Sequence, residues 1–323
     1  MPPGIAVRPP AAATELTEPD GFDAFWTRTL RAAEARAYAP EFTPVETGLP
    51  LLDTYDVTFA GHDGEPVRAW LRTPAGAEAR GERLPCLVEY LGYGRGRGLA
   101  HENPLWATAG YAHLLMDTRG QGWSAATGDT PDSGPTPPGA VPGFLTRGLD
   151  DPHAHYYRRV FTDAVRCVAT ARAHPVVDPA RVAVTGISQG GGIALAVAGL
   201  VPDLAAVLPD VPFLCDIPRG VAEAELPPYT EIVEHLALHP DRTGAAFETL
   251  AHFDAALHAA RAPAPALFSV ALRDPICPPS TVRSAYERYA GPKEIRAYPF
   301  NGHEGGGAQH QREQLAWLRA TLG

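Results

Sequence analysis

Residues 181–200, RVAVTGISQGGGIALAVAGL, decide the fold. The run RVAVTGI is apolar and rich in β-branched residues, which is typical of a strand buried on both faces. After Ser188, the run QGGGIALAVAGL is apolar throughout, which predicts a buried helix. A serine on a sharp turn between such a strand and helix is the arrangement of a nucleophile elbow. The same serine could be one more polar residue in a glycine-rich turn, so its partners must be sought elsewhere in the chain.

Short β-rich runs alternate with helical patterns from about residue 51 onward. The later runs are continuously apolar, as strands buried on both faces should be, and helical stretches lie between them. We therefore expect an α/β fold, with a mostly parallel central sheet, helices on both faces and antiparallel strands at its start. The runs are YDVTF, VRAWL, PCLVEYL, AHLLMD, RVAVTG, AAVLPD, ALFSVAL and EIRAYPF.

The chain is expected to consist of an N-terminal extension and one domain that carries two insertions. Residues 1–50 are expected to form a helical or irregular extension that packs on the core, and residues 51–323 a single α/β domain. Within that domain, residues 122–147 are a proline- and glycine-rich stretch too long for an ordinary loop, which predicts an arm or lid. Residues 214–262 are expected to form a helical insertion that caps a site.

Composition excludes several classes of partner. The 323 residues carry a formal net charge of −10, with charges scattered rather than clustered, which argues against nucleic acid and anionic membranes. The four cysteines lie far apart with no C-x-x-C pair, which favours free thiols in a reducing compartment. The N-terminus lacks a basic start followed by an apolar run, and the longest apolar run is too short to span a bilayer. We expect a cytoplasmic protein.

A serine nucleophile needs a base, and the base needs an orienting acid. His303 follows the last predicted strand and lies in a loop, NGHEGGG, ahead of the final helix, so it is the candidate base. Two aspartates that end apolar strands are candidate acids, Asp274 and Asp210. Asp274 is favoured because only one helix and one strand separate it from His303.

The oxyanion of an acyl-transfer reaction needs two N–H donors. One is expected from the backbone of Gln189, at the start of the helix after the serine. The second should come from the loop after the third strand, EYLGYGRGRG, where the Tyr93 amide is the candidate and its ring could wall the acyl pocket.

Neither a nucleotide cofactor nor a metal is expected. The glycines of EYLGYGRGRG do not satisfy G-x-G-x-x-G, and no matching acid follows a second strand. His235 and His239 have the i, i+4 spacing of a metal pair, but they lack the glutamate of H-E-x-x-H.

Several strings together resemble the acetyl xylan esterase and cephalosporin C deacetylase family, α/β-hydrolases that act on acetyl esters. DTRGQG at 117–122 is similar to its R-G-Q signature, GISQGGG at 186–192 to its G-x-S-Q-G motif, and NGHE at 301–304 to its H-E motif. Further likeness extends through GFLTRGLDDPHAHYYRRVFTDAVR, DVPFLCDIPRG and RDPICPPSTVRSAYERY. The likeness extends from about residue 20 to the C-terminus.

The resemblance implies roles for named residues. It implies Ser188 as nucleophile, Asp274 as acid and His303 as base, with the amides of Tyr93 and Gln189 as the oxyanion hole. It also implies that two residues of the R-G-Q motif, Arg119 and Gln121, shape the loop beneath the site rather than perform chemistry.

The resemblance further implies a homo-hexameric ring in which the 122–147 insertion contributes to subunit contacts and restricts access to small substrates. One departure is Leu91, where members of the family often carry a histidine, which could alter the wall of the pocket. Tyr93 and Pro212 would make the pocket short, which favours an acetyl group.

The expected activity is therefore hydrolysis of short-chain acetyl esters of carbohydrates or small molecules through an acyl-enzyme. Two alternatives stay open: an acyltransferase or cyclising enzyme that uses the same triad, and a binding protein with a lapsed site.

Overall fold

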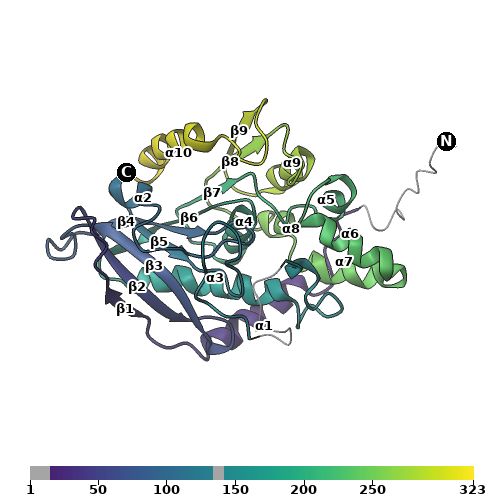
Figure 1. Ribbon diagram of the computed structural model, residues 1–323, viewed down its shortest axis with the longest axis horizontal. Helices are drawn as coiled ribbons and strands as arrows, with labels where there is room; N and C mark the ends of the chain where they lie inside the picture. Colours follow the sequence, from purple (N-terminus) through teal and green to yellow (C-terminus); the bar gives the residue numbers. More distant parts are fainter. Residues whose placement is uncertain (1–14, 134–141) are drawn as a thin grey trace.

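The computed structural model describes residues 15–133 and 142–323. Within these residues nine strands form a single sheet in the order β1-β2-β3-β5-β4-β6-β7-β8-β9. Figure 1 shows the sheet passing through the molecule from β1 at one edge to β9 at the other. The strands are β1 Glu41–Pro44, β2 Leu52–Ala60, β3 Pro66–Pro74, β4 Leu84–Tyr90, β5 Ala112–Met116, β6 Val177–Ile187, β7 Ala206–Asp210, β8 Ala266–Ala271 and β9 Lys293–Tyr298.

The pairing of the strands changes once across the sheet, from antiparallel to parallel. The pairs β1–β2, β2–β3 and β3–β5 are antiparallel, whereas β5, β4, β6, β7, β8 and β9 run parallel. Each predicted run overlaps one of the strands β2 to β9, so the predicted α/β fold is confirmed. Because the six parallel strands point the same way, the residues that follow them meet at one edge of the sheet.

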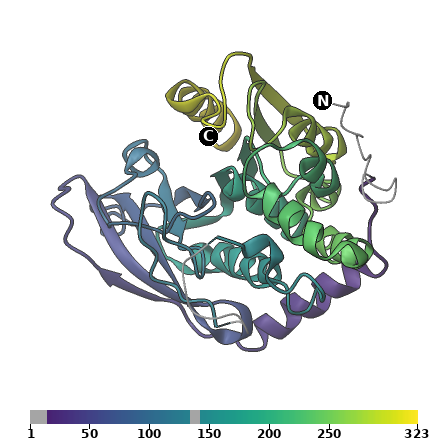
Figure 2. The same ribbon diagram turned by 45° about the vertical axis from the view of Figure 1, so that its right-hand side comes forward.

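Helices cover both faces of this sheet. Helices α3, α4, α8 and α9 pack on one face, with α1 outside α3, whereas α2 and α10 pack on the other (Figure 2). The helices are α1 Phe22–Glu34, α2 Leu105–Thr108, α3 Tyr156–Ala173, α4 Gln189–Leu200, α5 Ile217–Glu223, α6 Tyr229–Leu238, α7 Thr243–Ala251, α8 Ala255–Ala259, α9 Pro279–Arg288 and α10 Gly307–Leu322.

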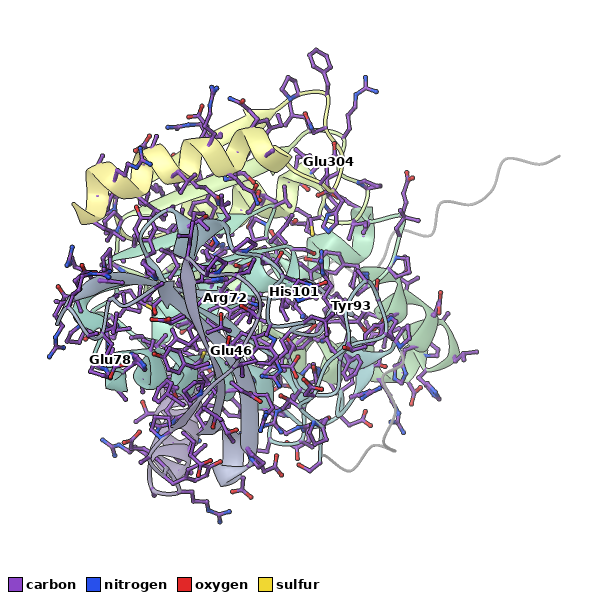
Figure 3. All side chains as sticks on the ribbon, turned by 60° about the vertical axis from the view of Figure 1, so that its left-hand side comes forward. Glu46, Arg72, Glu78, Tyr93, His101 and Glu304 are labelled. Atoms are coloured by element: carbon purple, nitrogen blue, oxygen red, sulfur yellow. The ribbon has the colours of Figure 1, made fainter. Side chains whose placement is uncertain are left out.

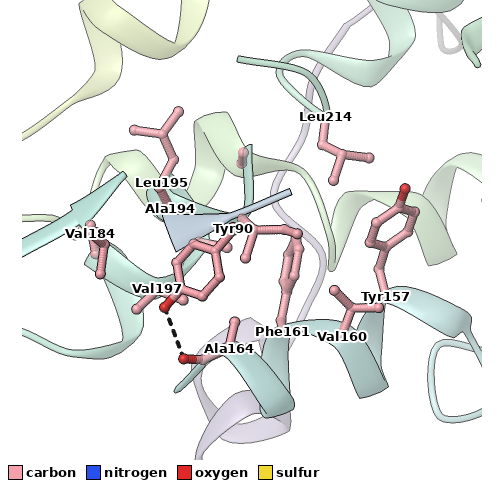
Figure 4. Packing of buried hydrophobic residues seen from close by; sticks show 14 of the residues in the cluster. Tyr90, Tyr157, Val160, Phe161, Ala164, Val184, Ala194, Leu195, Val197 and Leu214 are labelled. Atoms are coloured by element: carbon pink, nitrogen blue, oxygen red, sulfur yellow. Dashed lines mark hydrogen bonds between the residues drawn. The ribbon is translucent and has the colours of Figure 1, made fainter. Parts of the chain in front are cut away.

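Strand β6 lies between β4 and β7 inside the sheet, and its side chains enter the core on both faces. Val182 and Val184 join the large cluster beneath α3 and α4, whereas Ala183 joins the smaller cluster beneath α10. Figure 4 shows the larger cluster, in which the Tyr90 hydroxyl donates a hydrogen bond of 2.9 Å to the Ala164 carbonyl. Both partners are fully buried, so this bond satisfies two polar groups that water does not reach.

The segments outside the central fold contribute unequally to it. The N-terminal segment supplies α1, and also the edge strand β1, which the sequence did not indicate. The insertion between β7 and β8 supplies α5, α6, α7 and α8. Residues 134–141 of the expected arm lie outside the described residues. Across the described part of the chain, no helix combines the length and the apolar character that crossing a bilayer requires.

Candidate active site

Ser188 occupies the turn between β6 and α4, with backbone angles φ 58° and ψ −119°. A residue other than glycine rarely has a positive φ, so the surrounding structure holds Ser188 under strain. Only glycine fits at the positions two residues before and two residues after Ser188. A Cβ on Gly186 would lie 2.4 Å from the Gly190 carbonyl carbon, and a Cβ on Gly190 would lie 2.0 Å from the Tyr90 oxygen. The turn therefore has the geometry of a nucleophile elbow.

The next strand holds the elbow in place. The Ser188 N–H donates to the Asp210 carbonyl at 2.9 Å, and the Ser188 carbonyl accepts from the Phe213 N–H at 2.9 Å. Asp210 ends β7, and Phe213 follows it. Pro212, the expected wall of a short pocket, is buried within this same connection. The backbone after β7 thus fixes the position of Ser188.

The structure brings Ser188, His303 and Asp274 together in a row. His303 Nε2 lies 2.9 Å from Ser188 Oγ, and His303 Nδ1 lies 2.8 Å from Asp274 Oδ2. The three residues follow β6, β8 and β9, three of the parallel strands. The Asp274 side chain is fully buried, whereas the His303 side chain is 27% exposed. A proton on Nδ1 leaves Nε2 free to accept the serine proton.

Asp274 is held by its own turn. Its Oδ1 accepts the N–H groups of Ile276 and Cys277, each at 2.9 Å, while Oδ2 faces the imidazole. The Cys277 side chain is buried beside the triad. Burial and the charge of Asp274 raise the pKa of the Cys277 thiol well above its ordinary value, against the opposing effect of Ser188. Cys277 is therefore a neutral thiol at neutral pH.

Asp210, the alternative acid, has different partners. Its carboxylate accepts a hydrogen bond from the Ser269 hydroxyl and lies 4.0 Å from His310 Nε2. Burial raises the pKa of Asp210 to about 6, although Ser269 and the charge of His303 oppose the rise. The carboxylate that hydrogen-bonds to His303 in the described part of the chain is that of Asp274.

Glu304 folds the loop that carries His303. Its carboxylate accepts the Gly302 N–H at 3.1 Å and the Asn301 side-chain amide at 3.1 Å. Figure 3 shows Glu304 on this loop and Tyr93 on the loop after β4. Glu304 is exposed and makes these bonds within four residues, so the H-E motif is a local turn around the histidine.

Gln121 joins the two candidate oxyanion segments. Its Oε1 accepts the Gly94 N–H at 2.7 Å, and its Nε2 donates to Gln189 Oε1 at 2.8 Å. Gln189 in turn donates from Nε2 to the Leu91 carbonyl at 3.1 Å. Gln189 is also the first residue of α4, where a backbone N–H has no acceptor within the helix. These hydrogen bonds thus join the loop after β4 to the start of α4, next to Ser188.

Arg119 anchors the segment after β5, which also carries Gln121. It donates to Asp163 at 2.9 Å and to Glu65 at 2.7 Å, which ties the segment after β5 to α3 and to the β2–β3 hairpin. Burial alone would lower the pKa of Arg119, but the two carboxylates raise it above its ordinary value. These contacts place Arg119 as a buried cation with two anionic partners, and its role in shaping the loop stays a prediction.

The Tyr93 side chain has contacts that the sequence did not indicate. Its ring meets Trp123 edge-on at 5.3 Å, and its hydroxyl donates to Glu231 Oε1 at 2.7 Å. Glu231 lies on α6, in a helical pattern with nothing in its spacing to mark it as part of a site.

The turn around Asp274 could have been foreseen from the sequence, since aspartate commonly accepts N–H groups two and three residues ahead.

Three ligand-type side chains of the described residues come within 4.8 Å of one another: Asp274, Cys277 and His303. Asp274 and His303 hydrogen-bond to each other, and this bond explains why their ligand-type atoms lie so close together. His235 and His239 lie at one end of α6 with ring centroids 4.9 Å apart.

Comparisons with known proteins identify the family of the chain. Residues 12–321 match the model of the acetyl xylan esterase (AXE1) family. The structure is similar to an acetyl xylan esterase from Paenibacillus sp. R4, with 37% identity, a TM-score of 0.87 and coverage of 95% of this chain and 96% of that one. It is also similar to acetyl xylan esterase 1 from Thermoanaerobacterium sp. JW/SL YS485, with 29% identity, a TM-score of 0.83 and the same coverage.

A curated relative matches over a shorter region. Acetyl esterase Axe7A of Xylanibacter ruminicola is 30% identical over 180 residues, which make up 56% of this chain and 40% of that protein. The match thus spans less than half the length of this relative. The family model covers nearly the whole of the present chain, and the two solved structures each match 95% of it. The chain therefore belongs to the acetyl xylan esterase family, whose members are carboxylic ester hydrolases of the α/β-hydrolase fold.

Proposed function

We propose that this chain is a serine esterase that removes acetyl groups from carbohydrates or small molecules. The observation that carries the proposal is the pair of hydrogen bonds through His303, 2.9 Å to Ser188 and 2.8 Å to Asp274. Nucleophile, base and acid are then within reach of one another before any substrate binds. Family membership supports the acetyl ester as the substrate class.

Acylation begins with attack of Ser188 Oγ on the ester carbonyl. His303 Nε2 takes the serine proton as the bond forms and then gives it to the departing alcohol oxygen. Asp274 is fully buried against the imidazole, where its carboxylate stabilises the imidazolium and holds its Nδ1–H in place. The products of this half-reaction are the free alcohol and an acetyl group bound to Ser188.

Deacylation repeats these steps with water. His303 Nε2 removes a proton from the water as it attacks the acetyl carbonyl, and the proton passes to Ser188 Oγ when the acetate leaves. In both halves the carbonyl oxygen becomes an oxyanion, which we assign to the backbone N–H groups of Tyr93 and Gln189. Support for this assignment comes from Gln121, which hydrogen-bonds to Gly94 and to the Gln189 side chain.

The size of the acyl group follows from the walls near Ser188. Pro212 is buried beside the elbow, and Tyr93 lies on the opposite loop, so we propose a pocket that admits acetate and excludes long acyl chains. Relatives bear the names acetyl xylan esterase and acetyl esterase, so acetylated xylo-oligosaccharides are the first natural substrates to assay.

We also propose that the chain acts as a homo-oligomer, a hexamer by resemblance to its family, in a reducing compartment such as the cytoplasm. All four cysteines are unpaired and buried, which fits a reducing environment. Light scattering of the purified protein measures the subunit number directly. A monomer at assay concentrations would refute the oligomer and leave the esterase proposal intact.

Steady-state hydrolysis of p-nitrophenyl esters from acetate to octanoate tests the proposal. The acetate ester should be the best substrate. Turnover should vanish in Ser188→Ala and should be retained in the control Ser284→Ala on α9. Activity that survives in Ser188→Ala would refute the triad. A rate that rises with added alcohols, with ester rather than acetate as product, would instead identify an acyltransferase.

A further inference from the structure

Glu231 connects three segments that are distant in sequence. Glu231 lies on α6, and its Oε1 accepts hydrogen bonds from the Tyr93 hydroxyl at 2.7 Å and from the Gly143 N–H at 3.0 Å. Its Oε2 accepts the Leu145 N–H at 3.3 Å. Glu231 therefore joins the cap-like insertion, the loop after β4 and the segment that returns from the arm.

The Tyr93 hydroxyl is the centre of this network. Besides donating to Glu231, it accepts the N–H groups of Phe144 at 2.9 Å and Gly143 at 3.2 Å. Trp123 and Phe144 pack edge-on against the Tyr93 ring, with centroids 5.3 Å and 6.1 Å away. The ring is thus fixed at its tip by hydrogen bonds and along its sides by aromatic contacts, which leaves one orientation for the side chain.

Glu231 is suited to this position as a carboxylate. Burial raises its pKa above the ordinary value, but the Tyr93 hydroxyl, two backbone N–H groups and the charge of Arg147 all oppose the rise. Hydrogen bonds to an ionised acceptor are stronger than neutral ones, and the Glu231 carboxylate accepts from the Tyr93 hydroxyl as well as from two backbone N–H groups. A neutral side chain at this place would hold the tyrosine less firmly.

We propose that Glu231 is a positioning residue for the oxyanion hole, acting through the side chain of Tyr93. This inference rests on the proposed function, in which the Tyr93 N–H binds the oxyanion. The hydroxyl and the N–H belong to one residue, so fixing the ring limits the rotation of the peptide that carries the N–H. Oxyanion donors work only when they are pre-aligned, and small misplacements are costly in rate.

The test compares Glu231→Ala, Glu231→Gln and Tyr93→Phe with the control Glu234→Ala, an exposed glutamate on the same helix. In Glu231→Ala and Tyr93→Phe, both kcat and kcat/KM for p-nitrophenyl acetate should fall about tenfold, less than direct loss of a donor costs. KM should change by less than about twofold, because acylation and deacylation use the same oxyanion hole and should slow by similar factors. Glu231→Gln keeps one amide oxygen as acceptor and should lie between wild type and Glu231→Ala.

Two readouts separate positioning from mere destabilisation. The inhibition constant of methylboronic acid should rise in parallel with the loss of kcat/KM, because its serine adduct places a hydroxyl where the oxyanion forms. The double variant Glu231→Ala/Tyr93→Phe should be no slower than the slower single variant, because both substitutions break the same hydrogen bond.

Some outcomes would overturn the inference. Rates in Glu231→Ala within twofold of wild type, or losses in the double variant that multiply, would show that Glu231 does not act through Tyr93. If Glu231→Ala does not fold, Glu231→Gln and Tyr93→Phe decide in the same assays. Failure of the proposed function has a different signature: wild type would not hydrolyse p-nitrophenyl acetate, or Ser188→Ala would remain active.

Discussion

At the scale of the residue, Asp274 is the most constrained member of the site. It accepts His303 Nδ1–H together with the N–H groups of Ile276 and Cys277. In Asp274→Asn, the amide would favour the wrong imidazole tautomer and would leave the imidazolium without a counter-charge. We expect kcat for p-nitrophenyl acetate to fall about 10³- to 10⁴-fold, as such a change does in other serine hydrolases.

Asp210→Asn is the matched control for this prediction, since Asp210 also follows a strand of the same sheet edge. It contacts Ser269 rather than His303, so kcat should stay within about tenfold of wild type. A large loss in Asp210→Asn with a small one in Asp274→Asn would reverse the assignment of the acid.

Asp210 also makes a prediction about pH and stability. Burial raises its folded-state pKa to about 6, so the folded chain holds a proton that the unfolded chain releases near 3.8. Its contribution to stability is therefore complete below about pH 3.8 and is lost as the pH rises through about 6. His310 faces the same carboxylate, and because burial lowers its pKa to about 4 it is mostly neutral from about pH 4.5 upward.

Denaturant unfolding of wild type and Asp210→Asn at pH 4.5 and pH 7.5 measures this effect. The free energy of unfolding of wild type should fall relative to that of the variant between these two pH values, by up to about 2 kcal/mol. A difference between the two proteins that is independent of pH would mean that Asp210 is not held in its neutral form.

Single residues of the site differ in how visible they were in the sequence. Ser188 and His303 lie in glycine-rich strings that directly follow a buried apolar strand and the last β-rich run respectively, and this context identifies them. Gln121 also lies in a recognisable string, but its bonds to Gly94 and Gln189 depend on how two loops meet. Glu231 lies in an ordinary amphipathic helix, and only tertiary packing brings it to Tyr93.

At the scale of the element, the elbow between β6 and α4 sets the positions of the other parts of the site. A Cβ on Gly190 would lie 2.0 Å from the Tyr90 oxygen, which is backbone and cannot move away freely. Gly190→Ala should therefore push α4 away from β4, lower the free energy of unfolding by about 1–3 kcal/mol and reduce activity.

Gly244→Ala provides the control, because Gly244 lies in α7 with nothing within 4 Å of a built Cβ. That substitution should leave activity unchanged and stabilise the helix by up to about 1 kcal/mol. Urea unfolding and p-nitrophenyl acetate turnover measure both variants. A Gly190→Ala protein as stable and active as wild type would contradict the close approach of β4 and α4.

Elements with strong periodicity were the ones that the sequence could predict. The buried parallel strands are continuous apolar runs, and α3 has a full apolar face. Strand β1 was missed because EFTP has four residues, mostly exposed, with no alternation to recognise. It becomes a strand only because β2 offers it an unpaired edge.

At the scale of the whole molecule, α1 joins the N-terminal segment to the core. Trp26 is 2% exposed, packs on Phe161 and donates from Nε1 to the His252 carbonyl at 3.1 Å. Trp26→Ala should lower the free energy of unfolding by about 3–5 kcal/mol, whereas Arg28→Ala, exposed on the same helix, should change it by less than about 0.5 kcal/mol. Equal stability of the two variants would mean that α1 is not part of the cooperative core.

The whole chain is arranged so that one sheet edge collects the reactive groups. The order of Ser188, Asp274 and His303 along the chain, each after a different parallel strand, could be read from the sequence because a parallel sheet places all such residues at one edge. What the sequence could not give is the set of polar contacts beneath and beside that edge, since these depend on how the loops and the cap pack.

The most direct test of the account is to trap the acetyl group on Ser188. Wild type mixed with p-nitrophenyl acetate should release a burst of p-nitrophenolate equal to the enzyme concentration, because activated esters acylate faster than water deacylates. After an acid quench, peptide mass spectrometry should find one acetyl group on the peptide that contains Ser188, and none in Ser188→Ala. An acetyl group on another residue, or a burst that persists in Ser188→Ala, would contradict the account.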